Sequence, residues 1–132
     1  MNDTQNSELK KILIVEDDEF LRSLTVKRLE KENYAISIAV DGKDALAKIS
    51  ESTPDLILLD LLLPGIDGFE VLAKMQESET QSSIPVLVFS NLGQREDIEK
   101  AKSLGADDFL IKANFTLDDV VAKVGDYLGK NK

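Results

Sequence analysis

The sequence predicts an α/β fold in which helices cover both faces of one doubly wound parallel β-sheet. Two observations lead to this prediction. Runs of consecutive apolar residues, such as those at 12–15 and 56–59, do not alternate with polar residues, as is typical of strands buried on both faces. Segments with apolar residues at helical spacing separate these runs. Strict alternation of strands and helices calls for right-handed crossovers between parallel strands.

Each of the five predicted strands is a short apolar segment that stops at a polar residue or a turn. In chain order they cover residues 12–15, 34–40, 56–59, 85–89 and 109–111. Five strands suit the flavodoxin-like order 2-1-3-4-5, in which the chain reverses direction between the first and third strands.

The five predicted helices each have an apolar face, and several carry signals at their ends. In chain order they cover residues 19–33, 43–50, 69–75, 94–104 and 117–128. Gly105 is placed to end the fourth helix in a left-handed conformation. Thr116 is placed to cap the last helix, Asp118 and Asp119 lie in its first turn where the helix dipole favours negative charge, and Gly129 follows its end.

In the first helix, helical spacing separates an apolar face from a charged one. We expect Phe20, Leu21, Leu24 and Leu29 to point inward. The residues expected to point outward are Arg22, Lys27, Glu30 and Lys31.

The length of 132 residues suffices for one domain and leaves no room for a second folded module. We expect a flexible tail over residues 1–9, one domain over 10–129 and a frayed C-terminus over 130–132. The N-terminal segment is polar, and no stretch reaches about 18 uninterrupted apolar residues. We therefore expect a cytoplasmic protein that makes no membrane contact.

Charge and missing residue types exclude further classes of function. The formal net charge of −9 argues against a direct nucleic-acid partner, because basic surfaces bind phosphate backbones. The sequence has no cysteine and no histidine, which excludes disulfides, thiolate zinc sites, cysteine nucleophiles and imidazole bases. Any chemistry must use carboxylates, hydroxyls and lysines.

Reactive side chains follow four of the predicted strands. Glu16 and Asp17 follow the first, Asp60 the third, Ser90 the fourth and Lys112 the fifth. In the predicted strand order these strand ends border one crevice, where ligands bind in such folds. Taken singly, these residues also fit an exposed acidic loop, a lysine paired with a surface acid and a serine that caps a helix. Their convergence favours a functional site.

The residue types at this crevice suit phosphoryl transfer with a metal ion. Three carboxylates in one crevice repel one another, and a divalent cation removes that conflict. Oxygen ligands with open positions fit Mg²⁺. Asp60 follows a buried strand, so its shielded carboxylate can attack phosphorus and form an acyl phosphate. Lys112 and Ser90 are then suited to hold the phosphoryl oxygens.

Four motifs resemble the receiver domain of bacterial two-component response regulators, in its stand-alone, chemotaxis-regulator-like form. They are ILIVEDD over 12–18, DLLLPGIDG over 60–68, Ser90, and GADDFLIK over 105–112. The resemblance extends over about residues 11–128, and the motifs together are very specific.

The resemblance implies a role for each site residue. Asp60 would be the phospho-acceptor, Lys112 would contact the phosphoryl group, and Ser90 would reorient on phosphorylation. Phe109 matches an aromatic switch position that responds to Ser90, although it also fits an ordinary core residue. The implied Mg²⁺ ligands are Asp17 directly, Glu16 largely through water, Asp60, and the backbone carbonyl of Leu62.

The sequence departs from the family pattern at a few positions. Asn91 follows Ser90 where a smaller residue is commoner, which would narrow access to Asp60. Ala113 stands where the family usually has a proline, so the Lys112–Ala113 peptide could be cis or trans. Our hypothesis for Leu62 and Leu92 is that these apolar side chains keep water from the acyl phosphate.

The function that we expect is a signalling switch, which catalyses its own phosphotransfer and slow dephosphorylation and is not otherwise an enzyme. It would receive the phosphoryl group from a sensor histidine kinase or a phosphotransfer protein. It would then present the surface of the fourth helix, fifth strand and fifth helix to a separate output protein, as a monomer or a phosphorylation-dependent dimer.

Three alternatives remain open at this stage. One is a receiver-fold adaptor that acts without phosphorylation, as the departures at Asn91 and Ala113 would allow. Another is an aspartyl-phosphate phosphatase, whose Asp-x-Asp motif after the first strand is not matched by Glu16-Asp17-Asp18. The third is a flavin-binding module, which three acids after the first strand disfavour because they repel phosphate.

Overall fold

A computed structural model describes residues 9–129 of the chain. The tail predicted over 1–9, apart from Leu9, and the C-terminus predicted over 130–132 lie outside the described residues. In the described part, no helix combines the length and the apolar character that crossing a membrane requires.

One five-stranded parallel sheet forms the centre of the molecule, in the strand order β2-β1-β3-β4-β5. Its strands are β1 (Lys11–Val15), β2 (Ala35–Ala39), β3 (Leu56–Leu59), β4 (Val86–Ser90) and β5 (Asp108–Ile111). All four residues of β3 and all five of β4 are buried. The predicted order is confirmed, and so is the burial of the apolar runs at 12–15 and 56–59, whereas most residues of β2 are not buried.

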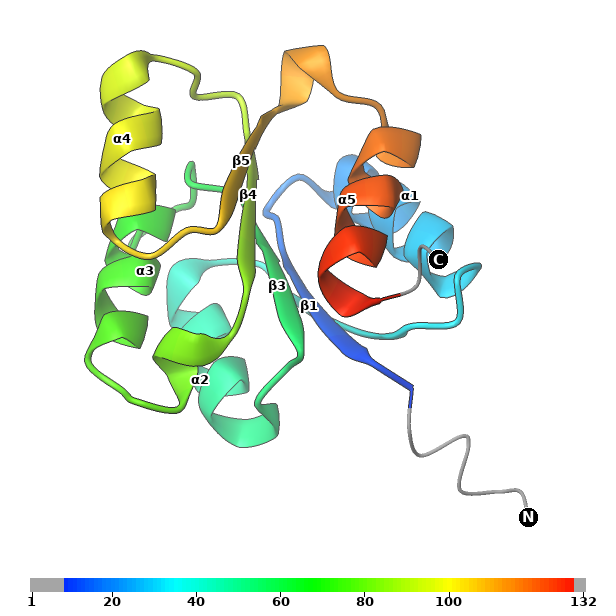
Figure 1. The fold of residues 1–132 in the computed structure, drawn as a ribbon, viewed down its shortest axis with the longest axis horizontal. Coiled ribbons are helices and arrows are strands. Elements are labelled where there is room, and N and C mark those ends of the chain that lie inside the picture. The colour runs from blue at the N-terminus through cyan, green and yellow to red at the C-terminus, as the bar shows by residue number, and fades with distance from the viewer. Residues whose placement is uncertain (1–8, 130–132) are drawn as a thin grey trace.

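Helices cover both faces of this sheet, as predicted. They are α1 (Glu19–Glu30), α2 (Gly42–Ser52), α3 (Gly68–Gln76), α4 (Arg95–Ser103) and α5 (Leu117–Leu128), with 3₁₀ turns η2 (Gln81–Ser83) and η3 (Lys112–Asn114). Figure 1 shows α1 and α5 on one side of the sheet and α2, α3 and α4 on the other. Each side encloses its own cluster of buried apolar residues, so the sheet is the middle of three layers.

The inward face predicted for α1 is partly wrong. Phe20 and Leu24 were expected to point inward, but they are 75% and 41% exposed. The buried face consists of Thr25 and Leu29, with Leu21 partly buried, since these residues are four apart and lie on one side of the helix. Thr25 can be buried because its hydroxyl donates a 2.8 Å hydrogen bond to the carbonyl of Leu21.

The length predicted for α1 is also wrong. The prediction extended the helix to residue 33, but the structure ends it at Glu30. Asn33 has φ of 67°, a left-handed conformation that does not continue a helix. The other predicted helix and strand ends lie within two residues of the observed ones.

The predicted helix-end signals at both ends of α5 are confirmed. Thr116 accepts a hydrogen bond from the Asp119 amide, and the Asp119 carboxylate accepts one from the Thr116 amide, which makes a capping box. Gly129 ends the helix with φ of 78°, and Gly105 follows α4 with φ of 106°. This arrangement fixes where α5 starts, just beyond the end of β5.

Gly68 brings the start of α3 against the end of β3. A Cβ atom at this position would lie 2.6 Å from the Leu61 Cα and 2.7 Å from the Asp60 carbonyl oxygen. Only glycine allows the two backbones to approach this closely. The close packing holds the segment that carries Asp60 in a fixed position.

Candidate functional site

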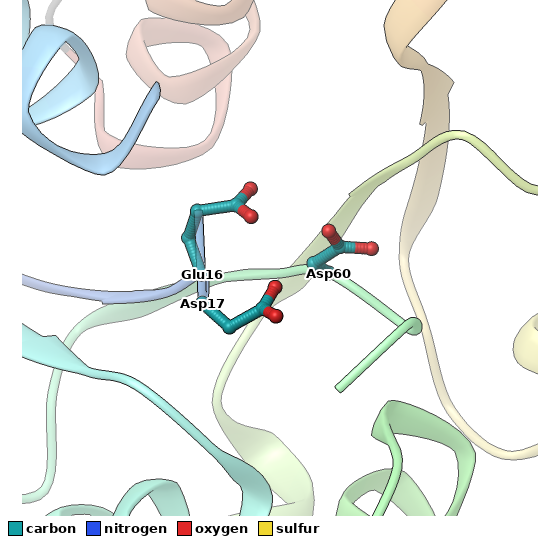
Figure 2. Close-up of side chains that lie close together, drawn as sticks. All are labelled: Glu16, Asp17 and Asp60. Carbon is teal, nitrogen blue, oxygen red and sulfur yellow. The ribbon is translucent and has the colours of Figure 1, made fainter. Parts of the chain in front are cut away.

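Three carboxylates meet at the carboxyl edge of the sheet, as predicted. Glu16 and Asp17 follow β1, and Asp60 follows β3, which pairs directly with β1. One oxygen from each side chain lies within 4.8 Å of the others, and Figure 2 shows the three groups together. Glu16 and Asp60 are each 4% exposed, whereas Asp17 is exposed, so the cluster opens to solvent on the Asp17 side.

The turn between β1 and α1 holds Glu16 through several hydrogen bonds. The Glu16 amide donates to the carbonyl of Ala39 at 3.1 Å, which anchors the residue to β2. The Glu16 carboxylate accepts a 3.1 Å hydrogen bond from the amide of Asp18, whose own side chain caps α1 by accepting from Leu21. The acidic side chain therefore has a set orientation toward the crevice.

Both oxygens of the Asp60 carboxylate have a donor. The amide of Leu62 donates to Oδ1 at 3.0 Å, and the Lys112 ammonium donates to Oδ2 at 2.7 Å. The Asp60 amide itself donates to the carbonyl of Val15 at 3.0 Å. These contacts hold the buried Asp60 carboxylate in a set orientation beside the other two acids.

Lys112 joins two of the acids. Its ammonium lies 2.8 Å from a Glu16 carboxylate oxygen and 2.7 Å from an Asp60 oxygen, and its side chain is 13% exposed. The same ammonium lies 5.8 Å from the centre of the Phe89 ring. The lysine thus places a positive charge between the Glu16 and Asp60 carboxylates and balances part of their negative charge.

Burial and hydrogen bonding act in opposite directions on the charged groups here. Burial raises the pKa of Glu16, and this outweighs the lowering effect of its hydrogen bonds with Lys112 and Asp18. Burial by itself would lower the pKa of Lys112, but its hydrogen bonds with Asp60 and Glu16 together outweigh burial and raise that pKa. Lys112 is therefore a cation at neutral pH.

Ser90 and Phe109 lie in the neighbouring strands β4 and β5. Ser90 is the last residue of β4 and is fully buried, and its hydroxyl accepts a 3.4 Å hydrogen bond from the amide of Leu92. Phe109 is 9% exposed and packs within the core cluster on the α2, α3 and α4 side of the sheet. The ring is inward in this structure, and its role as a switch stays a prediction.

The structure also shows the backbone geometry or the exposure of the positions that depart from the family pattern. None of the described residues has a cis peptide bond before it, so the Lys112–Ala113 bond is trans. Asn91 is exposed, Leu62 is 48% exposed, and Leu92 is partly buried against the core. The side chain of Leu62 is thus accessible two residues after Asp60.

Two contacts that shape this site could not be predicted from the sequence. One is the hydrogen bond from the Leu62 amide to Asp60. The other is the guanidinium of Arg22, predicted only to point outward, which donates to the Glu16 carbonyl at 2.9 Å. Neither contact has a sequence signal, because both depend on the path of a turn and on a side-chain rotamer.

The donor set suits a hard divalent cation. All three side chains offer carboxylate oxygens, two of them buried and held in place and one facing solvent. Mg²⁺ prefers few carboxylate ligands and keeps several water molecules, so a site with one open side fits it. Within residues 9–129, this is the one acidic, cysteine or histidine group with such spacing.

Solved structures of similar fold are receiver domains. A CheY-like response regulator receiver domain protein from Methanospirillum hungatei has a TM-score of 0.85 and 29% identity, covering 93% of this chain and 96% of that one. The chemotaxis protein CheY4 of Vibrio cholerae has a TM-score of 0.83 and 25% identity, covering 90% of this chain and 98% of that one.

Sequence relatives include larger regulators. The DNA-binding dual master transcriptional regulator RpaA of Synechocystis is 39% identical over 116 residues, which are 88% of this chain and 48% of that protein. The response regulator PleD of Caulobacter vibrioides is 40% identical over 111 residues, which are 84% of this chain and 24% of that protein. The chain thus spans half or less of the length of these relatives.

The family model for the response regulator receiver domain matches residues 12–125, which include every residue of the acidic cluster as well as Ser90 and Lys112. The fold, the strand order and this match agree. The chain therefore belongs to the receiver domains of two-component response regulators.

Proposed function

We propose that this chain accepts a phosphoryl group on Asp60 from a phosphohistidine, in a reaction that requires Mg²⁺. The observation that carries the proposal is the position of the Asp60 carboxylate. It is buried at the carboxyl edge of the sheet, 2.7 Å from the Lys112 ammonium and grouped with Glu16 and Asp17. Such an arrangement suits a nucleophile that receives negative charge and must have that charge balanced.

The reaction is a transfer between two nucleophiles. An Asp60 oxygen attacks phosphorus, so that a P–O bond forms while the P–N bond of the phosphohistidine breaks. The electron pair of that bond stays on the imidazole nitrogen, which then takes a proton from solvent. Because this chain contains no histidine, the phosphohistidine belongs to another protein, either a sensor histidine kinase or a phosphotransfer protein.

The other site residues divide the remaining tasks. Lys112 holds one phosphoryl oxygen, and the Ser90 hydroxyl turns to donate to another. Asp17 and Asp60 would ligate the metal directly, Glu16 would act largely through water, and the Leu62 carbonyl would complete the protein ligands. When bound, Mg²⁺ supplies positive charge against the phosphoryl oxygens and the carboxylates.

The response to phosphorylation follows from the contacts of Ser90. In this structure the Ser90 hydroxyl accepts from the Leu92 amide at the start of the segment that leads to α4. Once Ser90 turns toward the phosphoryl group, that contact is lost and Phe109 can follow. The surface of α4, β5 and α5 then favours an output partner, with the chain as a monomer or as a phosphorylation-dependent dimer.

We propose only a chemical class for the output partner. The relative RpaA is DNA-binding, but this chain matches 48% of that protein. Because the chain has a net charge of −9, we propose that this domain makes no direct contact with nucleic acid and acts through a protein.

Phosphorylation by a small donor tests the proposal. Incubation with Mg²⁺ and acetyl phosphate should add one phosphoryl group to the parent chain, as intact-mass spectrometry measures. Chelation of Mg²⁺, or the substitution Asp60→Asn, should abolish this addition. An Asp60→Asn variant that is labelled as well as the parent would overturn the assignment of the site.

The same experiment separates the remaining alternatives. A parent chain that is never labelled would favour an adaptor that acts without phosphorylation. Continuous release of phosphate from many small phosphate esters would favour a phosphatase instead. The single stable addition that we expect contradicts both.

A further inference from the structure

Among the three acidic residues of the site, Asp17 is the one whose side-chain contacts do not fix the position of its carboxylate. It is exposed, and its carboxylate forms no hydrogen bond or ion pair with any of residues 9–129. Glu16 and Asp60, by contrast, are buried and accept hydrogen bonds from fixed donors. The position of the Asp17 carboxylate therefore depends on the backbone of the turn at 16–18.

Arg22 holds this turn on both sides of Asp17. Its guanidinium donates from Nη1 to the Glu16 carbonyl at 2.9 Å, and its backbone amide donates to the Asp18 carbonyl, also at 2.9 Å. The peptide unit before Asp17 and the one after Asp18 are thus both bonded to one residue of α1. The amide bond belongs to the ordinary helix pattern, whereas the guanidinium bond depends on the side chain.

We propose that Arg22 is a positioning residue that presents Asp17 to the metal through the Glu16 carbonyl. This inference rests on the proposed function, because it assigns a residue to the Mg²⁺ site of that function. A hydrogen bond from a charged donor is stronger than a neutral one, and Arg22 is partly buried, which lessens competition from water. Outer contacts of this kind orient the groups that bind a metal.

The charge of Arg22 acts on metal binding in the opposite direction to its hydrogen bond. A cation near the carboxylates repels Mg²⁺, so removing the charge by itself would tighten binding. Removing the hydrogen bond frees the turn and would weaken binding. The sign of the measured change therefore shows which effect of Arg22 dominates.

Substitution Arg22→Met tests the positioning role, because methionine keeps an unbranched side chain and removes every donor. Isothermal titration should show Mg²⁺ binding weakened by about tenfold or more, the range typical of lost outer contacts. Arg22→Lys, which retains one donor group, should recover part of the affinity. Unchanged or tighter binding by Arg22→Met would overturn the inference.

Arg28→Met is the matched control. Arg28 also lies on α1 and is also partly buried, but its guanidinium bonds Glu32 and Asp118, away from the turn. Its removal should leave the Mg²⁺ affinity as in the parent. Equal weakening by both substitutions would show a general effect on α1 and would contradict a specific role for Arg22.

Two further measurements distinguish positioning from a loss of fold. In metal-free protein, amide hydrogen exchange should accelerate at residues 16–18 in Arg22→Met and stay unchanged in the sheet. With acetyl phosphate, the Mg²⁺ concentration for half-maximal labelling should rise, while the rate at saturating Mg²⁺ approaches that of the parent. Faster exchange throughout the molecule, or unchanged exchange at 16–18, would contradict the inference.

The outcomes also separate this inference from the proposed function. A parent chain that binds no Mg²⁺ and takes no label would contradict the proposed function. A parent that binds Mg²⁺ and is labelled, with an Arg22→Met variant that matches it, would contradict only the role of Arg22.

Discussion

The Lys112 ammonium lies 2.7 Å from an Asp60 carboxylate oxygen, although 52 residues separate the two in the chain. The same ammonium also contacts Glu16, so one lysine bridges the ends of β1 and β3. Without a metal, this cation opposes the mutual repulsion of three carboxylates. The fold thus holds Asp60, the proposed nucleophile, and a charge-balancing lysine together.

Removal of that cation should destabilise the metal-free protein. Lys112→Met leaves two carboxylates buried without their partner, which should lower the free energy of unfolding by about 3 kcal/mol. Mg²⁺ should restore part of this loss, because it supplies the missing positive charge. Urea unfolding with and without Mg²⁺ measures both effects. Lys123→Met, which removes the more exposed pair with Asp108, should change the stability by less than about 1 kcal/mol and show no Mg²⁺ dependence.

Removal of one acid should have the opposite effect. Asp17 is exposed and lies within 4.8 Å of two like charges, so Asp17→Asn should raise the stability of the metal-free protein by roughly 1 kcal/mol. The variant should in turn lose the stabilisation that the parent gains from Mg²⁺ binding. Thermal unfolding with and without Mg²⁺ compares the two proteins. Lower stability of Asp17→Asn in metal-free buffer would contradict a repulsive cluster.

Gly65, in the segment before α3, and Gly68, the first residue of α3, offer a comparison. Gly68→Ala places a methyl group 2.6 Å from the Leu61 Cα, so the backbone that carries Asp60 must shift, at a cost of about 2–3 kcal/mol. Gly65→Ala meets nothing within 4 Å and loses only about 1 kcal/mol from its φ of 71°. Gly68→Ala should unfold at a lower urea concentration than the parent, and acetyl phosphate should label it more weakly. Equal effects of the two substitutions would argue against the close approach.

The lifetime of the phosphorylated state tests the role of Leu62. Its side chain is 48% exposed two residues after Asp60, so Leu62→Asn would admit and orient water near the acyl phosphate. We expect hydrolysis to accelerate several-fold, as the decay of the phosphorylated mass measures. Leu9→Asn, at an exposed leucine that precedes β1, is the control and should leave the lifetime unchanged. An unaltered lifetime in Leu62→Asn would contradict a water-excluding role.

The fold could be predicted from sequence because its strands and helices carry clear local patterns. Buried parallel strands such as β3 read as continuous apolar runs, and the α5 ends carry a threonine cap and a terminal glycine. The face and the end of α1 could not be predicted in this way. Its buried face includes Thr25, which hydrogen bonding within the helix makes compatible with burial, while Phe20 remains exposed.

The candidate site could be predicted as a set of residues but not as a set of contacts. Strand order brings Glu16, Asp60 and Lys112 to one edge, so their convergence follows from topology alone. The donors to Asp60 from Leu62 and to the Glu16 carbonyl from Arg22 depend on the path of loops and on rotamers. Those features arise only once tertiary packing fixes the turns.

Chemical trapping of the phosphorylated residue tests the central claim most directly. Borohydride reduces an aspartyl phosphate to homoserine, so the parent chain should be reduced after incubation with Mg²⁺ and acetyl phosphate, then digested and sequenced by mass spectrometry. We predict homoserine at position 60, and none when Mg²⁺ is chelated. Homoserine at position 17 or at another acid, with Asp60 unmodified, would contradict the account.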